Sequence, residues 1–476
     1  EGAFRYAGNE FADEPITLTI PSTVTTIGNE AFLSSAFSSI SFVNGGTDPL
    51  AIGDKAFNSC TLLESIVFPA NLATLGVNVF QEEGYSSASS LTSIEVAEGC
   101  KAFASKDGAL YSGGFAELLF CPPAKTGKIT IADETLRIAD QAFAASKVEE
   151  VVFGENSRLT EIGNKAFLAC SNLTSVVLPD SVTTIGDSIF LRCYNLESVT
   201  LPASLASFSA SMLGCDSILN IYIGDGSTTY KSVGGVLFTA DLKTLVYYLP
   251  TSTAESYEIP AGTEQIAEGA FSGNAYLKNV TIPASVKLLN ANAFSNCTKL
   301  TGVNFADGST EPLVIGKYAF SGCTSLASIA LPSRTSAIED YAFNGDTSLS
   351  NISFNKATET SKLTSIGSNA FFRTAFTKVT VPEGVRTIGD TAYGNCYSLV
   401  TVTLPEGLIS IGNSVFSGAS MLDTVNIPAS LQTMGTGVFT NCTSLKHVNF
   451  ASGALIQTLP ADTFRGCTAL ESIQLP

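Results

Sequence analysis

The sequence contains no tryptophan, one histidine and three methionines. Charged residues make up 14% of its 476 residues, whereas hydrophobic residues make up 45%. A chain of this composition has too few charges for intrinsic disorder and enough apolar surface to bury a large core. We therefore expect a folded protein.

Basic clusters are missing as well. Lys and Arg total 25 against 43 Asp and Glu, which gives a net charge of -18, and no Lys/Arg run is longer than two. Nucleic acid and anionic membranes are poor partners for such a chain. No apolar stretch approaches the roughly 20 residues that span a bilayer, and no basic-then-apolar export signal opens the sequence. We predict no membrane insertion of this segment and expect any export signal or anchor to lie outside it.

The scarcity of histidine restricts catalysis. His447 lies in "LKHVNF", where alternation turns it outward; a catalytic zinc site needs two or three imidazoles, and no G-x-S-x-G elbow is present. Carboxylates on or beside the outward strand face lack the burial that would raise a pKa for glycosidase chemistry. These carboxylates are Glu64, Glu149, Glu150, Glu197 and Asp423. We predict that the protein is not an enzyme and has no catalytic residues, metal or cofactor.

What the sequence does contain is one phrase repeated along nearly its whole length, as in "LTSVVLPDSVTTIGDSIFLRC" over residues 173–193. A fixed period of this kind indicates a repeat architecture. The commonest spacing is 23 residues, as from Ile162 to Ile185. The register falls at Ile27, Ile52, Leu75, Ile138, Ile162, Ile185, Phe208, Ile266, Leu289, Ile315, Ile338, Ile366, Ile388, Ile411, Met434 and Leu459.

Each position of the phrase has a physical role. Val176 and Leu178 alternate with outward residues, which is the period of a strand with one buried face. Pro179 then ends the strand because it has no N–H to donate. Gly186 allows a close approach at the next corner, and Phe190 returns to the core. One phrase is therefore one coil, which can bury its apolar side only by stacking on its neighbours in a solenoid.

The motif L-x-x-[VI]-x-[LIF]-P-x-x-[LV]-x-x-[IL]-G-x-x-[AV]-F-x-x-C is matched at 173–193 and 422–442 except at one position in each, Ile189 and Met434. It resembles the leucine-rich repeats of the BspA-like family of bacterial surface proteins. The resemblance implies a repeat solenoid: a β-rich parallel ladder of leucine-rich repeats with short helical turns around Ala-Phe. We predict one solenoid over residues 1–476, with about 23 residues per repeat. Phe208, Met212 and Tyr393 depart from the motif in individual coils.

Two long segments interrupt the register, between Leu75 and Ile138 and between Phe208 and Ile266. They contain the similar stretches "FASKDGALYSGGFAELLFCPP" and "YKSVGGVLFTADLKTLVYYLP". Each stretch is typical of two strands around a Gly or Asp turn, so we predict hairpin insertions near 95–136 and 222–262, each projecting from an extra coil.

Nine of the eleven cysteines follow the Phe position by three residues, at 60, 170, 193, 215, 297, 323, 396, 442 and 467. Stacked equivalent positions give no basis for a pairing scheme, so we predict a column of small buried thiols. Ser35, Ser146, Asn274, Asp346, Thr374 and Ala419 occupy the same slot. Cys100 and Cys121 lie off this column, and the sequence leaves open whether they pair.

The outward strand positions are mostly short and polar, and repeat solenoids generally bind partners through their ladder surface. Tyrosines gather in the second insertion, and our candidate partner-binding residues are Tyr222, Tyr230, Tyr248 and Tyr257. Alternation turns Tyr247 or Tyr248 inward, so part of this group only packs the hairpin.

The shape and composition favour a non-enzymatic extracellular or cell-surface binding protein. The resemblance narrows this to an adhesin that recognises host or bacterial proteins. Cell-surface carbohydrate recognition and a structural display stalk remain the alternatives.

Overall fold

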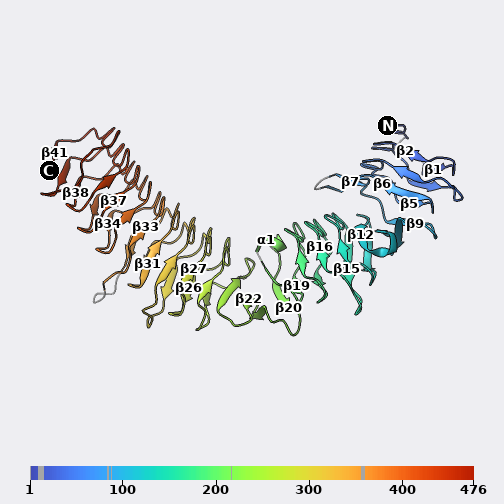
Figure 1. Ribbon diagram of the computed structural model, residues 1–476, viewed down its shortest axis with the longest axis horizontal. Helices are drawn as coiled ribbons and strands as arrows, with labels where there is room; N and C mark the ends of the chain where they lie inside the picture. Colours follow the sequence, from blue (N-terminus) through green and yellow to red (C-terminus); the bar gives the residue numbers. More distant parts are fainter. Residues whose placement is uncertain are drawn as a thin grey trace. The chain divides into compact units, whose positions relative to one another are not determined.

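The computed structural model describes residues 2–8, 15–82, 85–86, 88–208, 210–215, 217–354 and 360–475. The chain divides into two compact units, Glu1–Gly235 and Val236–Pro476, called unit 1 and unit 2. Within each unit, short coils stack side by side (Figure 1). The helices among the described residues are η1 (Gly113–Phe115) and α1 (Ala210–Leu213). The predicted parallel solenoid of stacked coils is confirmed, and its continuity as one domain over 1–476 stays a prediction.

The strands that precede the proline position form what we call the first ladder. In unit 1, Val176 pairs with Val199, and Val199 pairs with Ile221, all with their side chains buried. The strands of the first ladder in unit 1 are β1 (Thr17–Ile20), β3 (Ser39–Phe42), β5 (Ser65–Phe68), β9 (Ser93–Val96), β13 (Thr126–Thr130), β15 (Lys147–Val152), β17 (Ser175–Val177), β19 (Ser198–Leu201) and β20 (Asn220–Ile223). Those in unit 2 are β24 (Ser256–Glu258), β26 (Asn279–Ile282), β28 (Gly302–Phe305), β30 (Ser328–Ala330), β32 (Asn351–Ser353), β34 (Lys378–Thr380), β36 (Thr401–Thr403), β38 (Thr424–Ile427), β40 (His447–Phe450) and β41 (Ser472–Gln474).

The strands that end on the Ile-Gly register form the second ladder. Its glycines allow close stacking, because a Cβ added to Gly163 would lie 2.6 Å from the Asp140 backbone nitrogen of the preceding coil. In unit 1 the second ladder contains β2 (Thr26–Ile27), β4 (Leu50–Ile52), β6 (Leu72–Leu75), β12 (Glu117–Phe120), β14 (Arg137–Ile138), β16 (Glu161–Ile162) and β18 (Thr184–Ile185). In unit 2 it contains β23 (Thr244–Tyr247), β25 (Gln265–Ile266), β27 (Leu288–Leu289), β29 (Leu313–Ile315), β31 (Thr335–Ile338), β33 (Ser365–Ile366), β35 (Thr387–Ile388), β37 (Ser410–Ile411) and β39 (Thr433–Met434).

The Ala-Phe segments, expected to be short helical turns, are chains of β-turns. The Ala144 N–H donates to the Gln141 carbonyl (2.9 Å) within the coil, whereas the Phe143 N–H donates to the Ala166 carbonyl (2.8 Å) of the next coil. Gln141 and Ala145 also adopt positive φ, at 58° and 57°. A right-handed helix tolerates neither the left-handed residues nor the loss of every second N–H to a neighbour.

A column of stacked aromatic rings fills the core behind these turns. Phe320 stacks on Phe294 with 5.2 Å between ring centroids and on Phe343 with 5.3 Å. In unit 2 the column runs through Tyr248, Phe271, Phe294, Phe320, Phe343, Phe371, Tyr393, Phe416, Phe439 and Phe464. Aromatic pairs at these separations add attraction beyond the burial of their area.

The predicted thiol column runs beside the rings and is confirmed for eight of the nine cysteines, while Cys467 is half-buried. The thiols are also hydrogen-bonded: Cys170 donates to the Phe143 carbonyl (3.1 Å) and Cys323 to the Phe294 carbonyl (3.1 Å). A coil therefore fixes its neighbour through a side chain as well as through its backbone. The residues predicted to share the slot are buried too: Ser35, Ser146, Asn274, Asp346, Thr374 and Ala419.

Both insertions contain antiparallel strands that are built into the second ladder. In unit 1, β10 (Phe103–Lys106) pairs antiparallel with β11 (Ala109–Ser112), and β11 with β12, which then pairs parallel with β14. In unit 2, β22 (Val236–Thr239) pairs antiparallel with β23, which pairs parallel with β25. The remaining strands are β7 (Gln81–Glu82), β8 (Tyr85–Ser86) and β21 (Tyr230–Val233).

As expected, Cys121 does not occupy the slot position, but its side chain reaches the thiol column. Its Sγ lies 3.5 Å from Oγ of the slot residue Ser146, and the side chain is fully buried. The Cys121 N–H donates to the Ala142 carbonyl, and in the second insertion the Tyr248 N–H donates to the equivalent Ala270 carbonyl. Cys121 and Tyr248 thus hold equivalent places. Both Cys100 and Cys121 are free thiols.

Candidate binding surface

Three outward residues of the first ladder in unit 1 stand in register on neighbouring strands. Val177 of β17 pairs with Thr200 of β19, and Thr200 pairs with Tyr222 of β20. Val177 is 62% exposed and Tyr222 is 52% exposed. Since neighbouring strands lie about 4.8 Å apart, the two large side chains flank Thr200 about 10 Å from each other. We call Val177, Thr200 and Tyr222 the outward row of unit 1.

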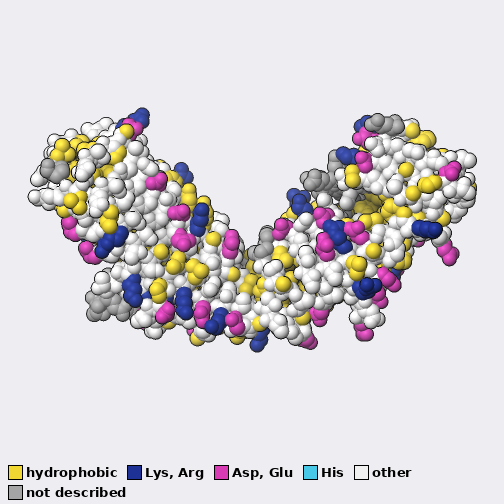
Figure 2. Space-filling model, viewed as in Figure 1, with side chains coloured by type: hydrophobic (Ala, Val, Ile, Leu, Met, Phe, Trp, Pro, Cys, Tyr) yellow, Lys and Arg dark blue, Asp and Glu magenta, His cyan; other side chains and the backbone are white. Residues whose placement is uncertain are grey.

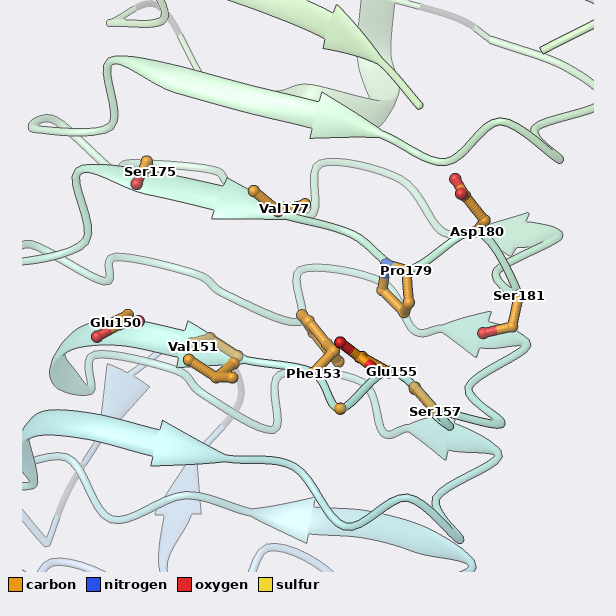
Figure 3. A pocket seen from close by; sticks show the side chains of 12 residues that line it. Glu150, Val151, Phe153, Glu155, Ser157, Ser175, Val177, Pro179, Asp180 and Ser181 are labelled. Carbon is orange, nitrogen blue, oxygen red and sulfur yellow. The ribbon is translucent and has the colours of Figure 1, made fainter. Parts of the chain in front are cut away.

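A groove of about 620 Å³ lies beside this row, between the coils of β15 and β17. Figure 3 shows its two walls. Phe153, Glu155 and Ser157 follow β15 on one side, and Pro179, Asp180 and Ser181 follow β17 on the other. The groove is open to solvent and combines apolar and acidic side chains.

The first ladder is interrupted at this groove. β13 and β15 form one sheet and β17, β19 and β20 another, and among the described residues no backbone hydrogen bond joins β15 to β17. The coil is longer here, because Ile162 follows Ile138 by 24 residues rather than 23. Gly154 also stands where the next two coils have Pro179 and Pro202, and Phe153 stands where they have Leu178 and Leu201.

Backbone groups at the interruption face the groove. The Val152 carbonyl accepts from the Ile131 N–H on one side, and the Leu178 N–H donates to the Thr200 carbonyl on the other. Successive residues of a strand point their backbone groups alternately to its two neighbours. The N–H and C=O groups of Val151 and Val177 therefore point into the gap between β15 and β17.

The groove is acidic. Glu150 lies 3.5 Å from Lys128, with both side chains exposed, and Asp180 Oδ1 accepts the Ala203 N–H (2.8 Å). No cationic side chain of the described residues pairs with Glu155 or Asp180. On the face drawn in Figure 2, most of the surface is uncharged and the acidic and basic side chains are scattered. Glu155 and Asp180 therefore leave a local negative field at the groove.

Of the four predicted tyrosines, Tyr222 is exposed, whereas Tyr230 and Tyr248 are buried, with exposed fractions of 9% and 3%. The Tyr248 hydroxyl hydrogen-bonds the Ser252 hydroxyl (2.9 Å), and its ring stacks on Phe271. Burial raises the pKa of Tyr230. The assumption that these two rings are exposed is therefore wrong, because the insertion uses them as packing residues.

Tyr257 is half-buried on β24 and occupies an inward position, paired with Val280. Its ring lies 4.8 Å from the Tyr248 ring, and burial raises its pKa to about 12. The sequence carried this signal, since "SYEIP" matches "SVTLP" of the repeat and puts Tyr257 at the inward Val position. A binding role for the four tyrosines stays a prediction, for which the structure offers only the Tyr222 ring as a large exposed surface.

Sequence reasoning missed Val177 and Leu219, which are exposed on the same face of unit 1 as Tyr222. Their signal was a large apolar residue at a position where most other coils carry a polar or charged one, such as Thr200 for Val177 and Glu197 for Leu219. Such a departure stands out only after the outward positions have been separated from the inward ones.

The other residues that could take part in catalysis or metal binding do not come together among the described residues. His447 faces outward with Nδ1 3.0 Å from the Ser472 hydroxyl. In the parts of the chain that the structure describes, no group of three or more His, Cys, Asp or Glu residues is placed to hold a metal ion. Among the same residues, no helix has the length and apolar character that a bilayer crossing requires.

Comparison with known families gives one match that covers most of the chain. The family described as "BspA type Leucine rich repeat region (6 copies)" matches residues 10–106, 118–238, 246–362 and 364–476. A search among curated proteins gave no match.

Several solved structures are similar to the chain. A leucine rich cell surface protein from Faecalibacterium prausnitzii is 21% identical over 81% of this chain and 87% of that chain, with a TM-score of 0.40. A leucine-rich repeat protein from Bacteroides ovatus is 22% identical over 78% and 91%, with a TM-score of 0.37. The pneumococcal vaccine antigen PcpA is 19% identical over 96% and 83%, with a TM-score of 0.31.

Proposed function

The chain belongs to the BspA-type leucine-rich repeat family, and from this premise we propose that it is a non-enzymatic extracellular binding protein. Its ligand is a protein, on a host or bacterial surface, and it binds the outward side of the first ladder in unit 1. The role is that of an adhesin displayed at or released from the cell surface.

The outward row of unit 1 is the observation that carries this proposal. Val177 and Tyr222 are large, exposed and held on rigid neighbouring strands, on a face whose other outward positions are mostly Ser, Thr and Asn. Aromatic and apolar anchors within a polar surround are typical of protein interfaces. A surface that served only as a spacer would gain nothing from exposing them.

Carbohydrate recognition is the alternative that the experiment must separate. Sugar platforms use aromatic faces, and the chain offers no tryptophan and one exposed tyrosine ring on this face. A display stalk, the other alternative, predicts no ligand for this face at all.

Binding to a panel of immobilised extracellular matrix proteins and to a glycan array tests the proposal. We expect the full chain to bind at least one matrix protein and the Val177→Ser/Tyr222→Ala variant to bind it about tenfold or more weakly, as expected for interface anchors. The matched control is Thr403→Ala/Asn449→Ala, at outward positions of β36 and β40 in unit 2, which should bind like the parent. Binding to glycans alone, or equal losses in both variants, would overturn the proposal.

A further inference from the structure

We propose that the groove between β15 and β17 binds an extended, basic segment of the protein ligand. The segment lays its apolar side chains on Phe153 and Val177 and places Lys or Arg side chains beside Glu155 and Asp180. This inference rests on the proposed function and names the kind of polypeptide that the same face recognises.

The unpaired strand edges favour an extended segment. Val151 and Val177 point backbone N–H and C=O groups into the gap, where no other strand of the described chain satisfies them. A peptide in the extended conformation offers complementary groups along its whole length, and domains that bind peptides at open sheet edges use this complementarity. A folded globular surface could not reach into the gap in this way.

The apolar walls of the groove favour a segment in which every second side chain is apolar. Val177 presents an exposed apolar side chain next to the gap, and Phe153 and Pro179 form apolar parts of the two walls. A volume of about 620 Å³ lies within the usual range of pockets that take a short segment or small ligand. Since residues of an extended chain point alternately to opposite sides, one set can meet these apolar walls while the other set meets the rim.

The charges at the groove favour a cationic segment. Glu155 and Asp180 have no cationic partner among the described residues, and Lys128 reaches only Glu150. Each exposed ion pair contributes little by itself. Several together speed association, reject acidic segments and weaken with added salt. A net charge of -18 on the whole chain acts in the same direction.

Unit 2 provides an internal comparison. A groove of about 230 Å³ crosses β36, β38 and β40, but these strands belong to one continuous sheet and leave no gap between them. Its outward side chains include Thr403, Asn426 and Asn449. Interruptions of the first ladder also occur in unit 2, between β28 and β30 and between β32 and β34. The gap alone is therefore not the distinguishing feature; unit 1 combines it with the groove, the exposed Val177 and the carboxylates.

The test uses the full chain and a fluorescent eight-residue peptide that alternates Val and Lys, with a Val-Glu peptide and a Ser-Lys peptide as controls. Fluorescence anisotropy should show binding of the Val-Lys peptide about tenfold or more tighter than either control, with an affinity that falls as salt is added. Glu155→Gln/Asp180→Asn should weaken it about fivefold or more. Asn at position 180 keeps the oxygen that accepts the Ala203 N–H, so the coil should stay folded.

The matched control is Glu406→Gln/Asp423→Asn in unit 2, which should leave peptide binding unchanged. Failure of the Val-Lys peptide to bind, or equal binding of the Val-Glu peptide, overturns the inference. If matrix-protein binding still depends on Tyr222 in that case, the proposed function stands and only the basic segment is lost. If instead the peptide binds as expected but no matrix protein does, the adhesin role fails while the specificity of the groove remains.

Discussion

The first ladders of the two units are built on the same inward residues and differ in their outward ones. Val176 and Val199 of unit 1 are buried like Val425 and Val448 of unit 2. On the outward side, unit 1 has Val177, Thr200 and Tyr222 and an interrupted ladder, whereas β34 to β41 of unit 2 present polar residues, mostly Thr and Asn, on a continuous ladder. The fold is therefore specified by one set of positions and recognition is left to the other.

Packing explains why the inward residues are alike in the two units whereas the outward residues differ. An inward side chain touches the coils on both sides, so its volume is fixed by close packing. An outward side chain meets mostly solvent and an outward residue of the next coil, as where Asn449 Nδ2 donates to Asn426 Oδ1 (2.9 Å). Val177 and Tyr222 could therefore appear in unit 1 without cost to the core.

The largest effects should come from removing a ring of the aromatic column, which both units contain. Phe167 in unit 1 stacks between Phe143 and Phe190, and Phe320 in unit 2 stacks between Phe294 and Phe343, all fully buried. Replacing either by Ala should lower the free energy of unfolding by about 3–5 kcal/mol. Urea unfolding followed by circular dichroism measures this. A cost much below this range in one unit alone would show that the cores are not equivalent.

A smaller effect should follow from replacing Asp346, which occupies a cysteine position of the thiol column. Asp346 is fully buried; its Oδ1 accepts the Cys323 N–H (2.8 Å), whereas Oδ2 has no partner in the described structure. Burial raises the pKa of this carboxyl well above its usual range. Asp346→Cys should raise the free energy of unfolding at pH 7 by about 1–3 kcal/mol, because an unsatisfied buried polar atom is removed. Denaturant unfolding of the two chains gives the difference.

Asp346 should also make the free energy of unfolding depend on pH. A carboxyl with a raised folded pKa keeps its proton in the native state, so stability is fully present below the unfolded pKa of about 4 and is lost as pH rises toward the folded value. The Asp346→Cys gain should therefore shrink in acid. Asp423→Asn is the contrasting control: the hydrogen bond from Lys446 lowers the pKa of this exposed carboxyl, so the variant should lose rather than gain stability at pH 7, and this loss should shrink in acid. An Asp346→Cys gain that is equal at all pH values would exclude ionisation as its cause.

Placing the two large side chains of the outward row of unit 1 at the equivalent positions of unit 2 tests how much they contribute by themselves. Thr403→Val with Asn449→Tyr places the two large side chains on β36 and β40 of unit 2, on either side of Asn426. We expect a few-fold gain in matrix-protein affinity at most, because Tyr is a hot-spot type but the acidic groove between β15 and β17 and its unpaired strand edges have no counterpart at β36 to β40. Surface plasmon resonance measures the change. A gain equal to the loss in Val177→Ser/Tyr222→Ala would mean that the groove contributes nothing.

The smallest effect concerns a charge cluster on unit 1. Arg137 donates to Glu161 (2.9 Å) and Asp140 (2.9 Å) and also to Glu117, and the hydrogen bond to Glu161 is the main cause of its raised pKa. Its side chain is about one-third exposed, so solvent screens the cluster. Arg137→Gln should cost below about 1 kcal/mol. Thermal unfolding with and without added salt should show the parent losing more stability to salt than the variant.

The repeat allowed the inward half of the molecule to be predicted from the sequence. The Ile-Gly register, the buried Phe column and the thiol slot follow from spacing and period alone, because a stack must place equivalent residues alike. The Ala-Phe turns were wrong because inter-coil hydrogen bonds compete with the helix, and spacing does not reveal that competition.

The candidate site was only partly predictable. Tyr222 follows from its outward position, whereas the burial of Tyr230 and Tyr248 depends on how the second insertion packs, and no period exists there to read. The groove accompanies one additional residue in the coil and a Gly, Gly154, in place of Pro after β15. In the sequence these changes resemble ordinary variation between coils.

Hydrogen–deuterium exchange of the full chain, with and without the matrix protein that it binds, tests most directly that the ligand binds the outward side of the first ladder in unit 1. We expect protection in residues 147–157, 175–181 and 198–223, with exchange unchanged in 378–474. Protection confined to unit 2, or to the second ladder, would contradict the account.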